Sequence, residues 1–174
     1  MDFVEANGPF PGTVRERWLG PGYYYWDTFI NSAHFWGRYS YKKYNKGYII
    51  AKSEVALPPD KVLNLLDSAD LLKFHLWREE FKRTFPDTSV TVEKVLTHSR
   101  KTAGKNFPYI AIKALFIDSI NVEEYQDRIS PNGKAYLDMQ PPIQVCILEK
   151  SVVGPDNFKV IYPINYSDSA AYTF

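Results

Sequence analysis

The chain has 174 residues, of which 45% are hydrophobic and 16% aromatic, so it is large enough for one packed domain and too apolar for a disordered protein. Its 21 basic and 20 acidic side chains leave a net charge of +1, which excludes a general electrostatic attraction to nucleic acid or anionic membranes. The single cysteine, Cys146, excludes an internal disulfide and indicates a reducing compartment. No basic and apolar leader and no apolar run of membrane-spanning length is present, so we expect a cytoplasmic protein without a membrane partner.

The first elements that the sequence predicts are an extended arm and a short strand. Residues 1–18 hold several prolines and glycines but no periodic apolar pattern, which is typical of an arm or loop. Gly20 and Gly22 flank a proline, so the backbone there can turn sharply and approach a ligand closely. A strand over residues 22–26 follows, and its alternation places Tyr24 on the opposite face from its two tyrosine neighbours. We therefore expect a glycine-hinged turn and an aromatic strand at the wall of a ligand cleft.

A short helix and a second strand are predicted next. Asp27 or Thr28 can cap the helix, whose apolar residues are close to helical spacing, and Gly37 can end it. The strand covers residues 47–55 and begins with apolar side chains. Cations alternate with aromatic side chains over residues 38–48, a pattern that suits either an exposed loop or a platform for single-stranded nucleic acid.

Three helices are predicted in the middle of the chain. Two prolines and an aspartate should start the first, over residues 58–66. The second covers residues 68–85, where apolar side chains recur over most of a helical surface; it ends before Pro86 and should hold His75 as a hydrogen-bonded core residue. Residues 88–96 fit both helical and strand spacing, and we expect a helix.

The last part of the chain is predicted to be mainly strands. They cover residues 109–117, 142–148 and 158–163, with a turn at residues 131–133 between the first two. Because helices and strands do not alternate regularly, this order predicts a single α+β domain over residues 1–174 rather than a doubly wound nucleotide fold. Neither a GxGxxG nor a GxxxxGK[ST] loop is present to cradle phosphates.

Residue types that carry common chemistry give no recognised site. The three histidines lie far apart in the sequence, and no pair of cysteines or HExxH motif accompanies them. Cys146 lies within a predicted buried strand, where an inert thiol is the usual case, and no GxSxG motif is present. We therefore expect neither a metal site nor a serine or cysteine nucleophile.

The segment GPGYYYWDTFINSAHFW, residues 20–36, resembles a motif of the diphtheria-toxin-like and poly(ADP-ribose)-polymerase-like ADP-ribosyltransferases. In that family a Gly-x-Gly-x-Tyr strand precedes a Ser-Ala pair. On this match Tyr24 stands where a tyrosine stacks on the nicotinamide ring of NAD, and a phenol face can hold such a planar cationic ring. The resemblance implies an NAD site formed by Gly20, Gly22, Tyr24, Ser32, Ala33 and His34.

The segment PPIQVCILEKSVV, residues 141–153, resembles the strand that carries the family's third motif, a carboxylate that contacts the ribose of NAD. Gln144 stands at the glutamate position, so it can hydrogen-bond a ribose but carries no charge. The family's first motif has no match among the nineteen residues before Gly20. Tyr24 and Gln144 are therefore the candidate catalytic residues, and Gln144 suits mono-transfer, a non-protein acceptor or no transfer.

The resemblance implies an ADP-ribosyltransferase-like fold, with two splayed β-sheets around an NAD cleft and flanking helices. The implied reaction is transfer of ADP-ribose from NAD to a protein or nucleic-acid acceptor, with release of nicotinamide. The alternative is a catalytically silent module that binds NAD, ADP-ribose or a partner protein. An aromatic surface left by the missing first motif would suit a homodimer contact. The residues alone leave simpler interpretations open, because aromatic side chains are common on half-buried strands and Gln144 can be a satisfied polar group.

Overall fold

The computed structural model describes residues 3–13, 17–42, 46–116, 126–154 and 157–164. The elements in chain order are α1 (Phe3–Asn7), β1 (Tyr23–Trp26), α2 (Ile30–Lys42), β2 (Ile50–Ser53), the 3-10 helix η2 (Pro59–Lys61), β3 (Val62–Asn64), α3 (Ser68–Thr84), α4 (Val92–Ala103), the 3-10 helix η3 (Gly104–Asn106), β4 (Ala111–Leu115), β5 (Gln126–Arg128), β6 (Tyr136–Asp138), β7 (Ile143–Ile147), the 3-10 helix η5 (Lys150–Val152) and β8 (Phe158–Tyr162). The chain is α+β, as its sequence predicts.

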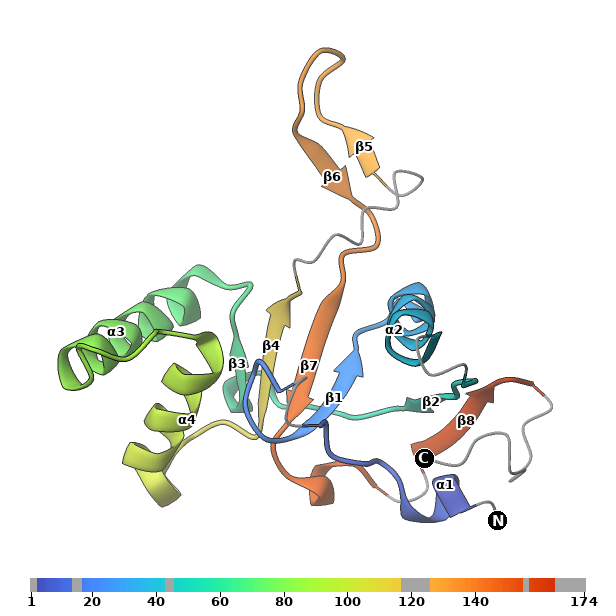
Figure 1. The fold of residues 1–174 in the computed structure, drawn as a ribbon, viewed down its shortest axis with the longest axis horizontal. Coiled ribbons are helices and arrows are strands. Elements are labelled where there is room, and N and C mark those ends of the chain that lie inside the picture. Colours follow the sequence, from blue (N-terminus) through green and yellow to red (C-terminus); the bar gives the residue numbers. More distant parts are fainter. Residues whose placement is uncertain (1–2, 14–16, 43–45, 117–125, 155–156, 165–174) are drawn as a thin grey trace.

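A four-stranded sheet with the order β1-β7-β4-β3 lies at the centre of the molecule (Figure 1). β7 pairs antiparallel with β1 and with β4, whereas β3 and β4 are parallel. Two further sheets have two strands each, β2 with β8 and β5 with β6. Figure 1 shows the β5–β6 hairpin projecting away from the body, while β2 and β8 lie to the side of β1, below α2 in this view. β1 is an edge strand of the central sheet.

Both faces of the central sheet are covered. α3 and α4 lie over one face (Figure 1), where Leu63, Leu96 and Ile112 are fully buried. On the other face, Val153 packs with Ala111 and Ile147. Full burial of a large aliphatic side chain contributes about 1.5–3 kcal/mol, so these two layers carry much of the stability of the fold.

Local capping explains where α3 and α4 begin and end. The Asp67 side chain accepts hydrogen bonds from the first backbone N–H groups of α3, and the Thr91 hydroxyl accepts one from Lys94 N at 3.2 Å in α4. Gly104, with φ of +54°, follows the last residue of α4. The predicted helix over residues 68–85 is confirmed, and the helix expected over residues 88–96 begins at Val92 and runs further. Among the described residues, none of the helices has the length and apolar character needed to cross a membrane.

The predicted strands after the glycine turn are confirmed as β1, β4, β7 and β8, and the strand expected over residues 47–55 is the shorter β2. The predicted turn is also present, at the end of the β5–β6 hairpin, where Gly133 N donates to Ser130 O at 3.1 Å. In contrast, the helix predicted over residues 58–66 is wrong. Val62 and Leu63 instead pair in parallel with β4, because a short apolar run fits a buried strand as well as a helix.

Gly37 does not end α2, which runs on to Lys42. A Cβ at Gly37 would lie 2.3 Å from the ring of Tyr48, so the glycine lets this ring pack against the helix. Residues 38–41 are consequently helical, which corrects the expectation of a loop there. Residues 43–45 lie outside the described part of the chain.

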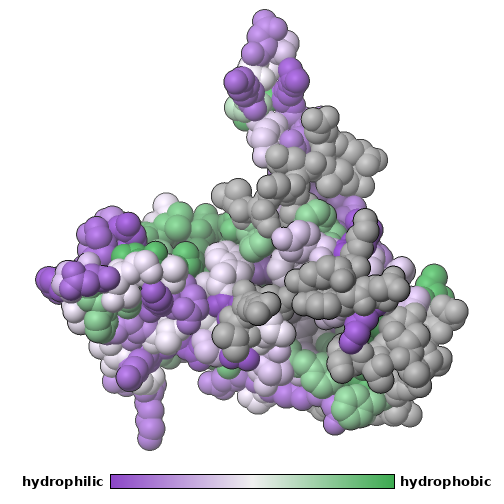
Figure 2. All heavy atoms as spheres, viewed as in Figure 1, coloured by the Kyte–Doolittle hydropathy of each residue, from purple (hydrophilic) through white to green (hydrophobic). Residues whose placement is uncertain are grey.

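Two other expectations are wrong. The arm contains the short helix α1, in which Val4 is buried. His75 is exposed rather than a core residue, because α3 packs on only part of its surface. Leu72 and Leu76 on the same helix are 62% and 61% exposed, and Figure 2 shows apolar residues gathered over α3.

Candidate functional site

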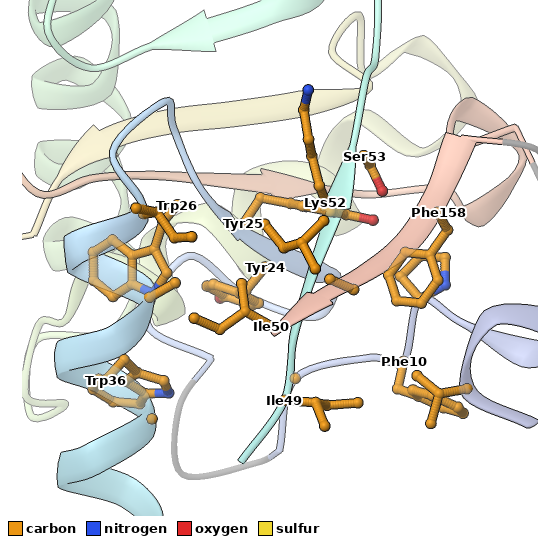
Figure 3. A pocket seen from close by; sticks show the side chains of 18 of the residues that line it. Phe10, Tyr24, Tyr25, Trp26, Trp36, Ile49, Ile50, Lys52, Ser53 and Phe158 are labelled. Atoms are coloured by element: carbon orange, nitrogen blue, oxygen red, sulfur yellow. The ribbon is translucent and has the colours of Figure 1, made fainter. Parts of the chain in front are cut away.

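A cavity of about 850 Å³ lies at the free edge of β1 (Figure 3). Its walls come from β1, α2, β2, β8 and the N-terminal segment. The aromatic residues that line it are Phe3, Phe10, Tyr24, Tyr25, Trp26, Phe29, Trp36, Tyr41 and Phe158. A cavity with so many ring faces and edges suits a planar, largely apolar ligand group.

Packing between aromatic side chains holds one wall of this cavity in place. The ring centroids of Trp26 and Trp36 are 6.3 Å apart. Phe116 meets both of them edge-on, at 5.7 Å from Trp26 and 6.0 Å from Trp36. Such pairs stabilise the arrangement beyond the area they bury, so the two indoles form a fixed wall rather than a loose surface.

The glycine turn before β1 is required by packing within the protein. Gly20 has φ of +89°, a conformation that other residues rarely adopt. A Cβ at Gly22 would lie 2.5 Å from Cys146 Sγ and 2.6 Å from Ile147 O. The sharp turn and close approach that the sequence predicts are therefore both present, but the group that Gly22 approaches is strand β7.

Tyr24 contributes its ring to the cavity, while its hydroxyl group is bonded to the backbone of the turn. The hydroxyl donates to Gly20 O at 2.8 Å and accepts from Leu19 N at 2.9 Å. Burial, together with the nearby Cys146, raises the pKa of the Tyr24 phenol. The phenol is thus neutral and fixed, and its ring face is the part that a ligand could meet.

Gln144 lies away from the cavity, on the same side of β7 as Cys146. It is 6% exposed, and its Oε1 accepts a hydrogen bond from Trp18 Nε1 at 2.6 Å. The Trp18 indole thus takes one of the two acceptor positions of the amide oxygen. Burial raises the pKa of the Cys146 thiol to about 11, so this cysteine is neutral and unreactive near neutral pH.

The three residues matched at the start of α2 face different surroundings. Ala33 lines the cavity, whereas Ser32 is buried and does not line it. His34 Nδ1 is 3.0 Å from the Tyr48 hydroxyl, and its ring lies edge-on to Tyr162 at 4.7 Å. Burial, with help from Arg38, lowers the pKa of His34 and favours a neutral imidazole. Of the residues matched to the family, the cavity therefore brings Tyr24 and Ala33 together.

Two residues that line this cavity carry buried hydroxyl groups that the sequence interpretation missed. Tyr25 Oη and Ser53 Oγ are buried without a hydrogen-bond partner among the described residues, and both residues line the cavity. Burial raises the pKa of the Tyr25 phenol, although the neighbouring Ser53 hydroxyl opposes this shift. Sequence alone gives only a weak signal for Ser53, as a polar residue in a mainly apolar strand.

The charged side chains on the described walls are already paired. Asp27 Oδ2 accepts from Lys113 Nζ at 2.6 Å, and Lys52 Nζ donates to Glu54 Oε1 at 2.7 Å. Within the described ranges, no cluster of three or more His, Cys, Asp or Glu side chains could hold a metal ion. The walls thus offer aromatic surface and hydroxyl groups rather than free charge.

No protein-family model matches this chain, and no curated protein or solved structure is significantly similar to it.

Proposed function

We propose that this chain is a binding protein whose aromatic cavity takes a planar ring, with NAD as the ligand that the ADP-ribosyltransferase resemblance predicts. The observation that supports this most is the cavity itself, where tyrosine and tryptophan rings surround a volume of about 850 Å³. Aromatic walls of this kind hold planar rings by stacked and edge-on contacts. Because the charged lining residues are paired, only the nicotinamide end of NAD is expected to enter.

Binding without transfer is favoured by the surroundings of Gln144. A transferase needs a group that stabilises positive charge on the ribose, and an uncharged amide supplies little of this. The Gln144 oxygen is also occupied by the Trp18 indole. A silent binding module needs neither a charge at this position nor a free amide, so it fits the site better than a transferase does.

Transfer of ADP-ribose is the second candidate, and one specific observation favours it. Tyr24 and Ala33, which match the family's nicotinamide-stacking tyrosine and its small helix residue, line the same cavity. A mono-ADP-ribosyltransferase would use this wall to hold the nicotinamide ring while ADP-ribose passes to a protein or nucleic-acid acceptor. Release of nicotinamide from NAD separates this candidate from a silent module.

The test fills the cavity and measures NAD binding. Ala33→Leu adds three carbon atoms at the cavity wall, while Ala69→Leu makes the same change on an exposed position of α3. We expect calorimetry to show NAD binding to the unmodified protein and to Ala69→Leu, but not to Ala33→Leu. Chromatography of the same samples should show no nicotinamide above the level of a protein-free control.

Other results would change the proposal in defined ways. Equal NAD binding by the two variants would place the NAD site elsewhere, and no binding by the unmodified protein would remove NAD as the ligand. Nicotinamide release that is lost in Ala33→Leu and kept in Ala69→Leu would establish the transferase in place of the silent module.

A further inference from the structure

Two buried hydroxyl groups, on residues that line the cavity, carry a further inference. Neither Tyr25 Oη nor Ser53 Oγ has a hydrogen-bond partner among the described residues. Tyr25 belongs to β1 and Ser53 to β2, and Figure 3 shows the two side chains pointing toward one another. Buried polar groups in native proteins are nearly always hydrogen-bonded, so an unpaired pair at one place needs an explanation.

The surroundings make these hydroxyl groups costly to retain. Tyr25 packs against an apolar cluster that contains Ala111, Ile147 and Val153. Phenylalanine at position 25 and alanine at position 53 would keep most of the packing without leaving a polar atom unpaired. Natural proteins tolerate such costs mainly where function requires them.

We propose that the hydroxyl groups of Tyr25 and Ser53 form a polar anchor for a planar ligand that carries one hydroxyl or carbonyl group on the ring entering the cavity. The inference rests on the proposed function, because it requires a ring in the cavity. Each hydroxyl can both donate and accept a hydrogen bond, and the serine can turn about its Cα–Cβ bond without moving the backbone. The anchor would fix the orientation of a ring that the aromatic walls hold without directional contacts.

The charged residues of the cavity are less suited than the two hydroxyl groups to orienting an uncharged ring. Asp27 and Lys52, the charged residues on the described walls, are bound to Lys113 and Glu54. Each of these charges is therefore already partly neutralised by its ion pair. A hydrogen bond from an uncharged ligand group to Tyr25 or Ser53 displaces no hydrogen bond that these hydroxyls make among the described residues.

The test compares 2-naphthol with naphthalene, which have the same fused ring with and without a hydroxyl group. Binding is measured from ligand fluorescence with the unmodified protein and with the double variant Tyr25→Phe/Ser53→Ala. Tyr23→Phe is the matched control, because Tyr23 lies on the same strand and the same face but does not line the cavity. We expect the unmodified protein and the control to bind 2-naphthol about five- to tenfold more tightly than naphthalene.

In the double variant, this preference should disappear while the affinity for naphthalene is kept. A preference that survives the double variant, or none in the unmodified protein, would overturn the anchor and leave ring binding intact. Failure of both compounds to bind the unmodified protein would overturn the anchor and the proposed ring site together.

Thermal unfolding without ligand supplies a second measurement. If the two hydroxyls are unpaired, the double variant should unfold at the same temperature as the unmodified protein or at a higher one. A clear decrease, absent from Tyr23→Phe, would show that the two hydroxyls satisfy each other, and it would overturn the proposed role.

Discussion

Tyr24 and Tyr25 are neighbours on β1, but their hydroxyl groups have opposite surroundings. The Tyr24 hydroxyl has two backbone partners in the glycine turn, whereas the Tyr25 hydroxyl is buried without a partner in the described part of the chain. The first arrangement is what a stable core requires, because the Tyr24 hydroxyl holds the turn at Gly20 against the start of β1. The second does not stabilise the fold, which makes Tyr25 the better guide to a ligand.

Among the substitutions considered, one at Gly22 should disrupt the packing of the glycine turn most strongly. Gly22→Ala would place a Cβ within 2.6 Å of the Ile147 carbonyl oxygen, a backbone atom that cannot rotate away. We expect a loss of about 3 kcal/mol in the free energy of unfolding, measured in urea. The control is Gly154→Ala, whose Cβ would meet no described atom closer than 3.5 Å and should change stability by less than about 0.5 kcal/mol. Equal effects of the two substitutions would show that Gly22 is not needed for packing.

The buried thiol of Cys146 should make the free energy of unfolding depend on pH. Burial raises the pKa of Cys146 from its ordinary value of 9.0 to about 11, so the folded state favours the protonated thiol. Its contribution is complete below pH 9 and is lost as the pH rises through 11, with a decrease of about 2 kcal/mol reached at pH 11. Urea unfolding from pH 8 to pH 11 should show this decrease, and Cys146→Ala should make it shallower. An identical pH profile for the variant would contradict the assigned cause.

The smallest changes in stability are expected from removing the hydroxyl groups of Tyr24 and Tyr25, and their difference tests whether the two hydroxyls have different surroundings. Tyr24→Phe leaves Leu19 N and Gly20 O without their partner, and we expect a loss of about 2 kcal/mol. Tyr25→Phe removes a hydroxyl that has no partner among the described residues, so the change should lie within about 0.5 kcal/mol of zero. Urea unfolding of both variants gives the two values. If Tyr25→Phe lowers the free energy of unfolding as much as Tyr24→Phe does, the Tyr25 hydroxyl has a hydrogen-bond partner and the contrast between the two hydroxyls is wrong.

Local sequence patterns predict much of this fold. The apolar periodicity of residues 68–85 predicts α3, and apolar runs bounded by prolines or glycines predict β4, β7 and β8. Such patterns fail at β3, because Leu63 is buried through parallel pairing with a strand far along the chain. They also fail at Gly37, where glycine accommodates the ring of Tyr48 within a continuing helix.

The candidate site is less predictable, because it too depends on contacts between residues that lie far apart in the sequence. Sequence reasoning identifies the aromatic strand and the residue Ala33, both of which contribute to the cavity. It cannot place Ser53 opposite Tyr25, because that meeting depends on how β2 lies against the edge of the central sheet. It also could not show that Trp18, from a segment without a periodic pattern, hydrogen-bonds the Gln144 side chain.

The four tryptophans of the chain can show directly whether the aromatic cavity binds a planar ring. Trp26 and Trp36 line the cavity, while Trp18 and Trp77 do not. Their indole N–H signals in a nitrogen-15 NMR spectrum, assigned with single Trp→Phe variants, can be followed as 2-naphthol is added. If the cavity binds the ring, the signals of Trp26 and Trp36 shift in a saturable manner and the Trp77 signal stays in place. Shifts confined to Trp18 or Trp77, or no shift at any ligand concentration, would contradict it.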